Sequence, residues 1–262
     1  QQEAILPDPQ GRRKIVLATS IAETSLTIEG ITVVIDSGYS RIPKFDPRSG
    51  LTRLETVRVT SDAADQRAGR AGRLSPGNCY RLWSEATHRN LVAQRKPEIL
   101  EADLAPLVLE LIAWGVPDLT SLNWITPPPL GAVQQAIDLL TQLEALEANR
   151  ITDRGRRMVL LPTHPRIAHM LTSVHDDGKS LALACDIAVL LEERDPLNNP
   201  SSADLSLRIE LLRKWRKGEH FSADKILLER IERLAKAWRK TFSVTVDNSN
   251  ISDEEVGALL AL

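Results

Sequence analysis

The eight residues from Gln66 to Arg73 constrain this chain more than any other stretch, because they place three arginines three residues apart with alanine and glycine between them. On a helix, that spacing turns successive side chains by about 60° around the axis, so the guanidinium groups point toward different partners. Each guanidinium is a planar fork of donors that suits phosphate. A solvated arginine-rich helix is the alternative, but two glycines would cost such a helix about 1 kcal/mol each. The octet therefore favours a phosphate-binding segment in which glycine lets a ligand approach the backbone.

The composition indicates a globular protein without an overall basic field. The chain has 262 residues, of which 42% are apolar, and a formal net charge of −2, so any nucleic-acid binding must come from local patches. Cys79 and Cys185 form no C-x-x-C pair, and we expect no metal site. No signal peptide and no run of about 18 apolar residues is present, so we expect a cytoplasmic protein that does not contact a membrane. The domain-like pattern at Gln1 and the helical pattern at the other end lead us to expect a piece of a longer protein.

Three short apolar runs predict strands in the first hundred residues. They are residues 14–19, 31–36 and 79–83, and the stretches between them have room for helices. Strands that alternate with helices predict an α/β layer with a parallel sheet. Residues 39–46 and 51–58 predict a pair of strands joined by a turn, which inserts a hairpin into this layer.

From about residue 101 the pattern becomes helical. Apolar residues at helix spacing predict a helix from residue 104 onward and another at residues 133–147. Residues 150–152 and 158–161 predict the two strands of a small wing, and helices followed by such a wing resemble a winged-helix domain. The remaining residues, 165–262, predict a wholly helical domain. Its expected helices are 166–175, 179–192, 203–217, 222–241 and 253–262.

A second stretch that could carry chemistry is the hydroxyl-rich crossover of residues 18–28, Ala-Thr-Ser-Ile-Ala-Glu-Thr-Ser-Leu-Thr-Ile, which follows the first predicted strand. In parallel α/β sheets, ligands bind beyond the carboxyl ends of the strands. Short hydroxyls and backbone N–H groups there can hold phosphate oxygens. Serines and threonines in such a cluster can equally cap helices, so the crossover alone leaves both interpretations open.

Together, the crossover and the octet resemble motifs V and VI of superfamily 2 helicases, in the DEAH-box and RNA-helicase-A branch. The two motifs occur in the order of that family, about 40 residues apart, with the predicted hairpin between them. The crossover departs from the family at Ser20, where asparagine is usual. Residues 109–116 and 161–171 further resemble a bacterial member of the branch.

The resemblance implies roles for five residues around ATP. Gln66, Arg70 and Arg73 would face the γ-phosphate and act in catalysis, with the two arginines as arginine fingers that stabilise charge on the transferred phosphoryl group. Ser25 would lie near the γ-phosphate. Glu29 would contact the ribose of the nucleotide, although the family usually carries aspartate at that position.

The resemblance also implies contacts with nucleic acid. Thr24 and Thr27 would lie near the RNA backbone, and the hairpin would help to part strands or hold bases. The basic residues of the hairpin that we expect to contact nucleic acid are Arg41, Lys44, Arg48 and Arg53. On sequence alone, the same charges could simply protect an edge hairpin from aggregation.

The groups that cradle a triphosphate are expected elsewhere in the protein. A P-loop requires Gly-x-x-x-x-Gly-Lys-Ser/Thr after a strand, and residues 177–180 match only its end, with Ser173 in place of the first glycine. No Asp-Glu-x-His box is present either. By resemblance, an N-terminal RecA-like lobe would hold most of the ATP and its Mg²⁺. We therefore expect this chain alone to have no ATPase activity.

The resemblance assigns residues 1–96 to a second RecA-like lobe, 97–164 to a winged-helix domain and 165–262 to a helical, ratchet-like domain. The chain would be the C-terminal half of an ATP-dependent RNA helicase, with single-stranded RNA or DNA, ATP and its own N-terminal lobe as partners. Two alternatives stay open: a non-enzymatic winged-helix adaptor that binds nucleic acid, and a DNA translocase.

The basic stretch of residues 205–240 has two interpretations. It carries eleven Lys and Arg against five Asp and Glu, with Trp215, His220, Phe221 and Trp238 among them. Basic and aromatic side chains together can track phosphates and stack bases. The competing interpretation is a solvated helix face whose tryptophans lie in the core.

Overall fold

The computed structural model describes residues 5–6, 8–24, 27–46, 51–116, 118–197, 202–219 and 223–262. The chain divides into two compact units, residues 1–103 with 124–129, and residues 104–123 with 130–262. We call them the sheet unit and the helical unit. Among the described residues, no helix is both long and apolar enough to cross a membrane.

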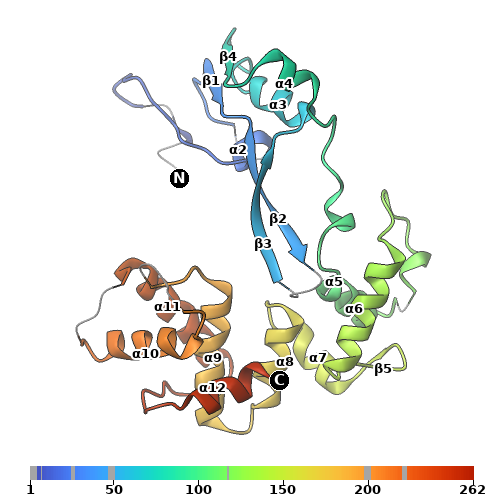
Figure 1. Ribbon diagram of the computed structural model, residues 1–262, viewed down its shortest axis with the longest axis vertical. Coiled ribbons are helices and arrows are strands. Elements are labelled where there is room, and N and C mark those ends of the chain that lie inside the picture. Colours follow the sequence, from blue (N-terminus) through green and yellow to red (C-terminus); the bar gives the residue numbers. More distant parts are fainter. Residues whose placement is uncertain are drawn as a thin grey trace. The chain divides into compact units, whose positions relative to one another are not determined.

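The sheet unit is built around two pairs of strands (Figure 1). Strands β1 and β4 are parallel, with Val33 opposite Asn78 and Asp36 opposite Arg81, which confirms the predicted parallel pairing. Strands β2 and β3 form the predicted antiparallel hairpin. In chain order the unit contains α2 (Ile21–Thr24), β1 (Val33–Asp36), β2 (Tyr39–Asp46), β3 (Leu51–Arg58), α3 (Ser61–Ala68), β4 (Asn78–Arg81), α4 (Glu85–Arg89) and the 3₁₀ helix η1 (Glu98–Leu100).

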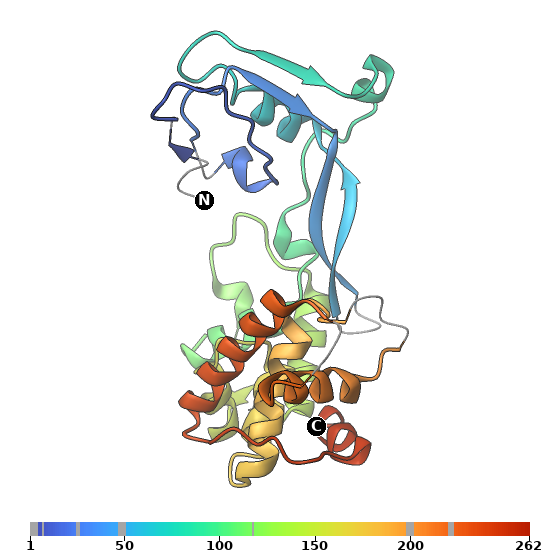
Figure 2. The same cartoon turned by 90° about the vertical axis from the view of Figure 1, so that its left-hand side faces the viewer.

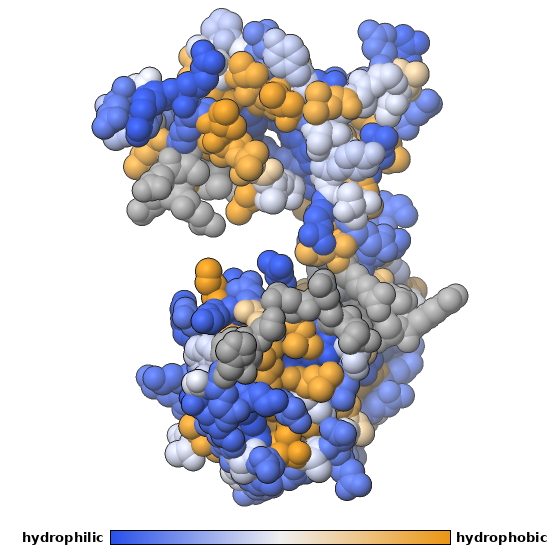
Figure 3. Space-filling view, turned by 60° about the vertical axis from the view of Figure 1, so that its left-hand side comes forward, coloured by the Kyte–Doolittle hydropathy of each residue, from blue (hydrophilic) through white to orange (hydrophobic). Residues whose placement is uncertain are grey.

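The sheet unit buries little apolar surface. Its core cluster consists of Val59, Ala63 and Ala64, against which Trp83 and Leu91 pack. Several large apolar side chains of the unit are instead exposed, and orange side chains are visible on its surface in Figure 3. Those on the parallel strands and just beyond are Val33, Ile35, Tyr80 and Leu82.

The strand predicted at residues 14–19 is not formed. This segment has no regular secondary structure, and Ile15 and Leu17 are 86% and 96% exposed. An apolar run becomes a parallel strand only when a neighbouring strand accepts its ladder of hydrogen bonds. Among the described residues, β1 pairs with β4 alone, so this run has no partner strand.

The helical unit is organised around α9 (Gly178–Glu192), whose residues 181–190 are all buried (Figures 1 and 2). Helices α8, α10, α11 and α12 pack against it. In chain order, the other elements of the unit are α5 (Ala105–Ala113), the 3₁₀ helix η2 (Leu119–Ser121), α6 (Leu130–Gln142), β5 (Leu146–Glu147), β6 (Arg150–Ile151), α7 (Asp153–Val159), α8 (Pro165–Ser173), α10 (Leu205–Arg216), α11 (Lys225–Thr241) and α12 (Asp253–Leu260).

The wing is formed by different residues from those predicted. Its strands β5 and β6 pair Leu146 with Ile151, and the turn between them has positive φ at Ala148 and Asn149. Such a two-residue turn matches the twist of a hairpin. The predicted second strand at residues 158–161 was wrong, because Thr152 caps a new helix, α7, by accepting a hydrogen bond from the Gly155 N–H.

The five helices predicted for residues 165–262 are confirmed, each end within three residues. Their starts are fixed by side chains that accept hydrogen bonds from the first backbone N–H groups. Asp177, Asp204 and Asp224 do this for α9, α10 and α11. Ser252 and Glu255 form a reciprocal capping box at the start of α12. Local capping chemistry explains why these boundaries could be predicted.

Candidate functional site

The arginine-rich octet is only partly helical. Helix α3 ends at Ala68 and Gly69 forms its C-cap. The N–H groups of Arg70 and Ala71 then bond to carbonyls three residues earlier, so the chain tightens into turns. Because glycine is a poor helix former, Gly69 and Gly72 end the helix here. Arg67 therefore lies on the helix, and Arg70 and Arg73 lie beyond it.

Arg67 is held inside the sheet unit by two carboxylates. Its Nη2 lies 2.6 Å from Glu23 Oε1 and its Nη1 lies 2.8 Å from Asp36 Oδ1. The side chain also donates to the carbonyl of Tyr39 and the hydroxyl of Ser40. Burial alone would lower the pKa of Arg67, but the hydrogen bonds to both carboxylates outweigh it and raise the pKa. This arginine ties α3 to α2 and to strands β1 and β2.

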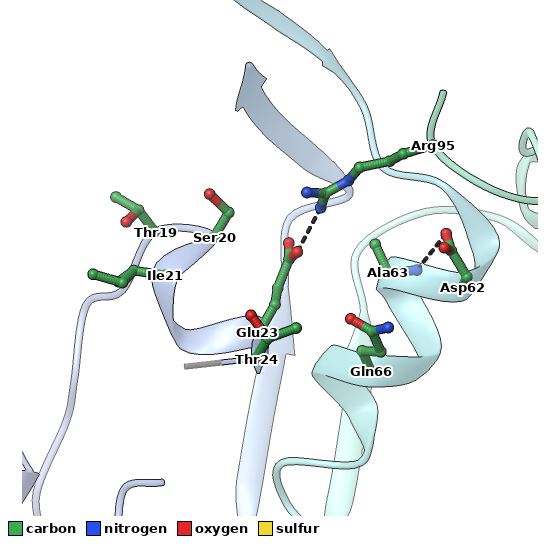
Figure 4. Close-up of a pocket in the computed structure, with 9 residues that line it drawn as sticks. All are labelled: Thr19, Ser20, Ile21, Glu23, Thr24, Asp62, Ala63, Gln66 and Arg95. Carbon is green, nitrogen blue, oxygen red and sulfur yellow. Dashed lines mark hydrogen bonds and ion pairs between the residues drawn. The ribbon is translucent and has the colours of Figure 1, made fainter. Parts of the chain in front are cut away.

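Glu23 holds a second arginine from a distant loop. It is 5% exposed, and its Oε2 accepts a hydrogen bond of 2.5 Å from Arg95 while its Oε1 faces Arg67. Figure 4 shows the Arg95 side chain reaching down to Glu23. The carboxylate thus fixes the short helix α2 within the crossover to both α3 and the segment after α4.

Arg70 and Arg73 instead turn toward uncharged acceptors on the crossover. Arg70 Nη2 donates to the backbone carbonyl of Glu23, and Arg73 Nη1 donates to the hydroxyl of Thr27 at 2.5 Å. Burial and the nearby charge of Arg73 lower the pKa of Arg70. An anion placed near both guanidinium groups would offset their mutual repulsion. The octet and the crossover therefore meet in the structure.

A cavity of about 400 Å³ opens between the crossover and α3 (Figure 4). The crossover supplies Thr19, Ser20, Ile21, Glu23 and Thr24, and α3 supplies Asp62, Ala63 and Gln66, with Arg95 completing the lining. Thr24 and Gln66, expected to contact RNA and ATP respectively, thus line one cavity. Arg70 and Arg73 do not line it.

The structure describes some, but not all, of the other residues that were predicted to contact ATP or nucleic acid. Glu29 is exposed in a turn that ends at Gly30, whose φ is +77°. On the hairpin, Arg41 and Lys44 are exposed, and Lys44 forms an ion pair of 3.1 Å with Glu55. The backbone of Arg53 lies opposite Lys44 in the ladder. Ser25 and Arg48 lie outside the described residues.

Sequence reasoning missed Glu23 and Arg95. A single acidic residue among the hydroxyls of the crossover was the available signal for Glu23, because a carboxylate in such a segment needs a cationic or N–H partner. Arg95 has no comparable signal, since it lies 72 residues from Glu23 in the sequence. No group of three His, Cys, Asp or Glu suited to a metal ion was found within the described part of the chain.

Comparison with protein families matches two parts of the chain. Residues 1–75 match the helicase conserved C-terminal domain, and residues 136–163 match the winged-helix form of the helicase associated domain HA2. The fold class is therefore confirmed as a RecA-like domain with a parallel sheet, then a winged helix and a mainly helical region.

Curated relatives are longer than this chain. The ATP-dependent RNA helicase HrpB of Escherichia coli is 48% identical over 199 residues, a match that spans 76% of this chain and 24% of the relative. The pre-mRNA-splicing factor ATP-dependent RNA helicase prp22 of Schizosaccharomyces pombe is 38% identical over 192 residues, which cover 72% of this chain and 16% of prp22. The matched residues therefore cover a quarter or less of each of these proteins.

Two crystal structures of E. coli HrpB, one described as a DExH-box NTPase and the other as a DEAH/RHA helicase, match the whole chain at 39% identity. Their TM-scores are 0.71 and 0.78, and the match covers 30% and 31% of those chains. HrpB is also the bacterial protein that residues 109–116 and 161–171 resemble, so the resemblance drawn from the sequence is confirmed.

Proposed function

Because this chain resembles the C-terminal portion of DEAH-box helicases such as HrpB, we propose that it supplies arginine fingers and nucleic-acid contacts to an ATP-dependent RNA helicase. The observation that carries this proposal is that the arginines of the octet have different kinds of partner. Arg67 is held by two buried carboxylates, whereas Arg73 is exposed and donates to a hydroxyl. An arginine that stabilises a phosphoryl group must be able to leave its resting acceptor, and a neutral hydroxyl is easier to leave than a carboxylate.

The two fingers act on charge that develops during phosphoryl transfer. Arg70 and Arg73 bring two positive charges to one edge of the sheet unit, where their mutual repulsion favours an anion. The γ-phosphoryl group of ATP gathers negative charge on its oxygens in the transition state, which guanidinium N–H donors stabilise. Gln66, exposed on α3, would orient the attacking water. These three residues are the proposed catalytic groups of the chain.

The magnesium ion that accompanies ATP is assigned to another lobe. No cluster of carboxylates suited to a cation is present among the described residues, and the P-loop lysine and DEAH-box carboxylates are absent from the sequence. Bound on that lobe, Mg²⁺ would supply positive charge that offsets the negative charge of the triphosphate. The residues of this chain would bind the outer face of the triphosphate, with Ser25 near the γ-phosphate and Glu29 near the ribose.

The crossover couples the nucleotide to nucleic acid. Thr24 lies at the end of α2 and lines the cavity that Gln66 also lines, and Thr27 accepts the hydrogen bond of Arg73. When hydrolysis removes the γ-phosphate, the fingers lose their partner and the lobes separate, so the hydroxyls of the crossover move relative to the RNA backbone. This is a two-state element biased by the phosphate. The exposed Arg41 and Lys44, with Arg48 and Arg53, would add backbone contacts from the hairpin.

We assign the second RecA-like lobe to residues 1–96, the winged helix to residues 97–164 and the helical, ratchet-like domain to residues 165–262. The division of the structure after residue 103 lies close to the first of these boundaries, and the HA2 match falls inside the second assignment. The helix α6 of the winged-helix domain carries no Lys or Arg, which supports packing against other parts of the protein rather than readout of a DNA groove.

The decisive experiment joins this chain to its native N-terminal lobe and measures ATP turnover with single-stranded RNA, single-stranded DNA or no nucleic acid. We expect turnover that RNA stimulates, and none from the 262-residue chain alone. Stimulation by DNA but not RNA would establish the DNA translocase. The absence of turnover in the joined protein, with nucleic acid still bound, would favour the non-enzymatic adaptor, and turnover by the chain alone would contradict the proposed division between lobes.

A further inference from the structure

The crossover is anchored to the sheet unit by a carboxylate rather than by apolar side chains. Its helix α2 has a single turn, and an isolated helix of that length is unstable in water. Among the four residues of α2, all of which the structure describes, Glu23 is the buried one, whereas Ile21 is 54% exposed. The segment before α2 adds little packing, since Ile15 and Leu17 are exposed as well. The position of the crossover therefore depends on the partners of Glu23.

Three arginines contact Glu23. Arg67 Nε donates to Glu23 Oε1 at 2.8 Å, and Arg95 Nη2 donates to Glu23 Oε2 at 2.5 Å (Figure 4). Arg70, one of the proposed fingers, donates to the backbone carbonyl of the same glutamate. The side chain of Glu23 thus pairs with two arginines, while its backbone provides the resting acceptor of the third. A shift of Glu23 would therefore move the position at which Arg70 rests.

The two arginines on the Glu23 carboxylate are not equivalent. The side chain of Arg67 is 15% exposed and also pairs with Asp36, so it stays anchored if Glu23 moves. The side chain of Arg95 is 42% exposed, and within the described part of the chain Glu23 is the carboxylate that it contacts. Arg95 can therefore be substituted while the arginine that ties α3 to the strands keeps its partners.

The segment that carries Arg95 is itself held by the start of α3. The first N–H groups of a helix have no partner within it. Here the Ser61 N–H donates to the Val92 carbonyl at 2.9 Å, and the next N–H along α3 donates to the Ala93 carbonyl at 3.2 Å. The Ser61 hydroxyl also donates to the Ala93 carbonyl. Because these bonds end two residues before Arg95, they fix the point from which its side chain reaches the crossover.

Loss of Arg95 would leave one oxygen of a buried carboxylate without its charged partner. Water would have to satisfy that oxygen, which weakens the hold on the crossover. Arg95 lies outside both helicase motifs, so the resemblance assigns it no role. Given the function proposed above, on which this role rests, we propose that Arg95 is a positioning residue. Through Glu23, it fixes the crossover where Arg70 can meet the phosphoryl group and where Thr24 can meet nucleic acid.

Hydrogen exchange, followed from milliseconds to minutes, tests the ion pair in the 262-residue chain without ATP or RNA. In Arg95→Gln, the amides of Ala22 and Glu23, which bond to carbonyls of the crossover, should exchange about tenfold faster, while those of α9 stay unchanged. Arg95→Lys keeps a cation for the same oxygen and should restore the slow exchange. The matched control is Arg89→Gln, which breaks an ion pair between two exposed side chains and should change nothing. Unchanged exchange in Arg95→Gln, or no rescue by Arg95→Lys, would overturn the proposal.

The second measurement is ATP turnover by the full-length protein with RNA. Arg95→Gln should lower kcat about tenfold and change KM for ATP less than about threefold, because Arg70 acts on the transition state while the other lobe binds most of the ATP. Arg89→Gln should leave both constants unchanged.

A double variant shows whether Arg95 acts through Glu23. In a Glu23→Gln background, Arg95→Gln should cause no further loss of kcat, because the two residues act as a unit. An equal further loss there, or a normal kcat in Arg95→Gln with faster exchange, would overturn the positioning role. Should Glu23→Gln fail to fold, rescue of kcat by Arg95→Lys decides the same point. If the parent protein shows no turnover, the proposed function fails, and hydrogen exchange still decides whether Arg95 holds the crossover.

Discussion

Two arginine-rich regions of this chain look alike in sequence and are used differently in the structure. In the basic stretch of the helical unit, the side chains of Arg208, Arg216 and Arg239 are at most 8% exposed and each is paired with a carboxylate. In the octet of the sheet unit, Arg67 is paired in this way with Glu23 and Asp36, whereas Arg73 donates to the hydroxyl of Thr27. The comparison teaches that arginine density alone does not indicate a binding site. What matters is whether a buried carboxylate opposes each guanidinium.

The helical unit uses its arginines to join three helices. Asp186, 1% exposed at the centre of α9, lies 2.7 Å from both Arg216 of α10 and Arg239 of α11. Glu232 of α11 closes the network by contacting the same two arginines. These buried ion pairs differ from both interpretations of the basic stretch, because the arginines neither form a solvated face nor are open to RNA, and Trp215 and Trp238 are only partly buried. His220 and Phe221 of the same stretch lie outside the described residues.

The largest effect is expected when a proposed arginine finger, rather than a surface arginine, is substituted. In the full-length protein, Arg70→Gln should lower ATP turnover about 10³-fold, the scale on which arginine fingers act, and should change RNA affinity less than about threefold. The matched control is Arg233→Gln, at an exposed position of α11, which should leave both quantities unchanged. Steady-state ATPase assays and RNA binding measured by fluorescence anisotropy check this. Loss of RNA binding with normal turnover would reverse the assignment of Arg70.

The second prediction concerns the paired arginines. Asp186→Asn leaves Arg216 and Arg239 without their shared charge, and it should destabilise the chain by about 3 kcal/mol, as for other broken buried ion pairs. Glu229→Gln, exposed on α11, should change the free energy of unfolding by less than about 0.5 kcal/mol. Urea denaturation followed by circular dichroism measures both. Equal stability of the two variants would mean that the network does not hold the helices together.

The third prediction tests whether a ligand approaches the backbone of the octet. A Cβ added at Gly72 would meet no atom within 4 Å, so Gly72→Ala should not destabilise the chain. If a polyphosphate packs against this backbone, the new methyl group should lower turnover about tenfold, which corresponds to about 1.4 kcal/mol. Gly257→Ala in α12 also meets open space and should leave turnover unchanged. Unchanged turnover in Gly72→Ala would place the ligand away from this backbone.

The smallest effect is expected on the hairpin. Lys44 and Glu55 are both about half exposed, so their ion pair should contribute at most about 1 kcal/mol to stability. Lys44→Gln should instead reduce the salt dependence of RNA binding by about one unit of log–log slope, if Lys44 contacts a phosphate. Titrations at several salt concentrations test this. An unchanged slope would favour the interpretation of an edge hairpin protected by charge.

Local features of this chain could be predicted and long-range ones could not. The helices of residues 165–262 follow from apolar spacing and capping residues that are neighbours in sequence. The strand predicted at residues 14–19 is not formed, because a strand also requires a partner strand. The hydrogen bonds of Glu23 reach Arg67 and Arg95, 44 and 72 residues away. Motif resemblance already singled out Arg70 and Arg73 as the proposed fingers, and the structure adds the two ion pairs that hold Arg67 inside the sheet unit.

The central claim is that the positive charge of Arg70 stabilises a phosphoryl group held by another lobe. Binding of a transition-state analogue tests this claim most directly. The measurement is the affinity of the full-length protein, and of its Arg70→Gln variant, for ADP with aluminium fluoride and for ADP alone. The account predicts that the variant loses at least a hundredfold in affinity for the analogue and less than threefold for ADP, because the finger acts only on the transferring group. Equal affinity of the two proteins for the analogue would contradict it.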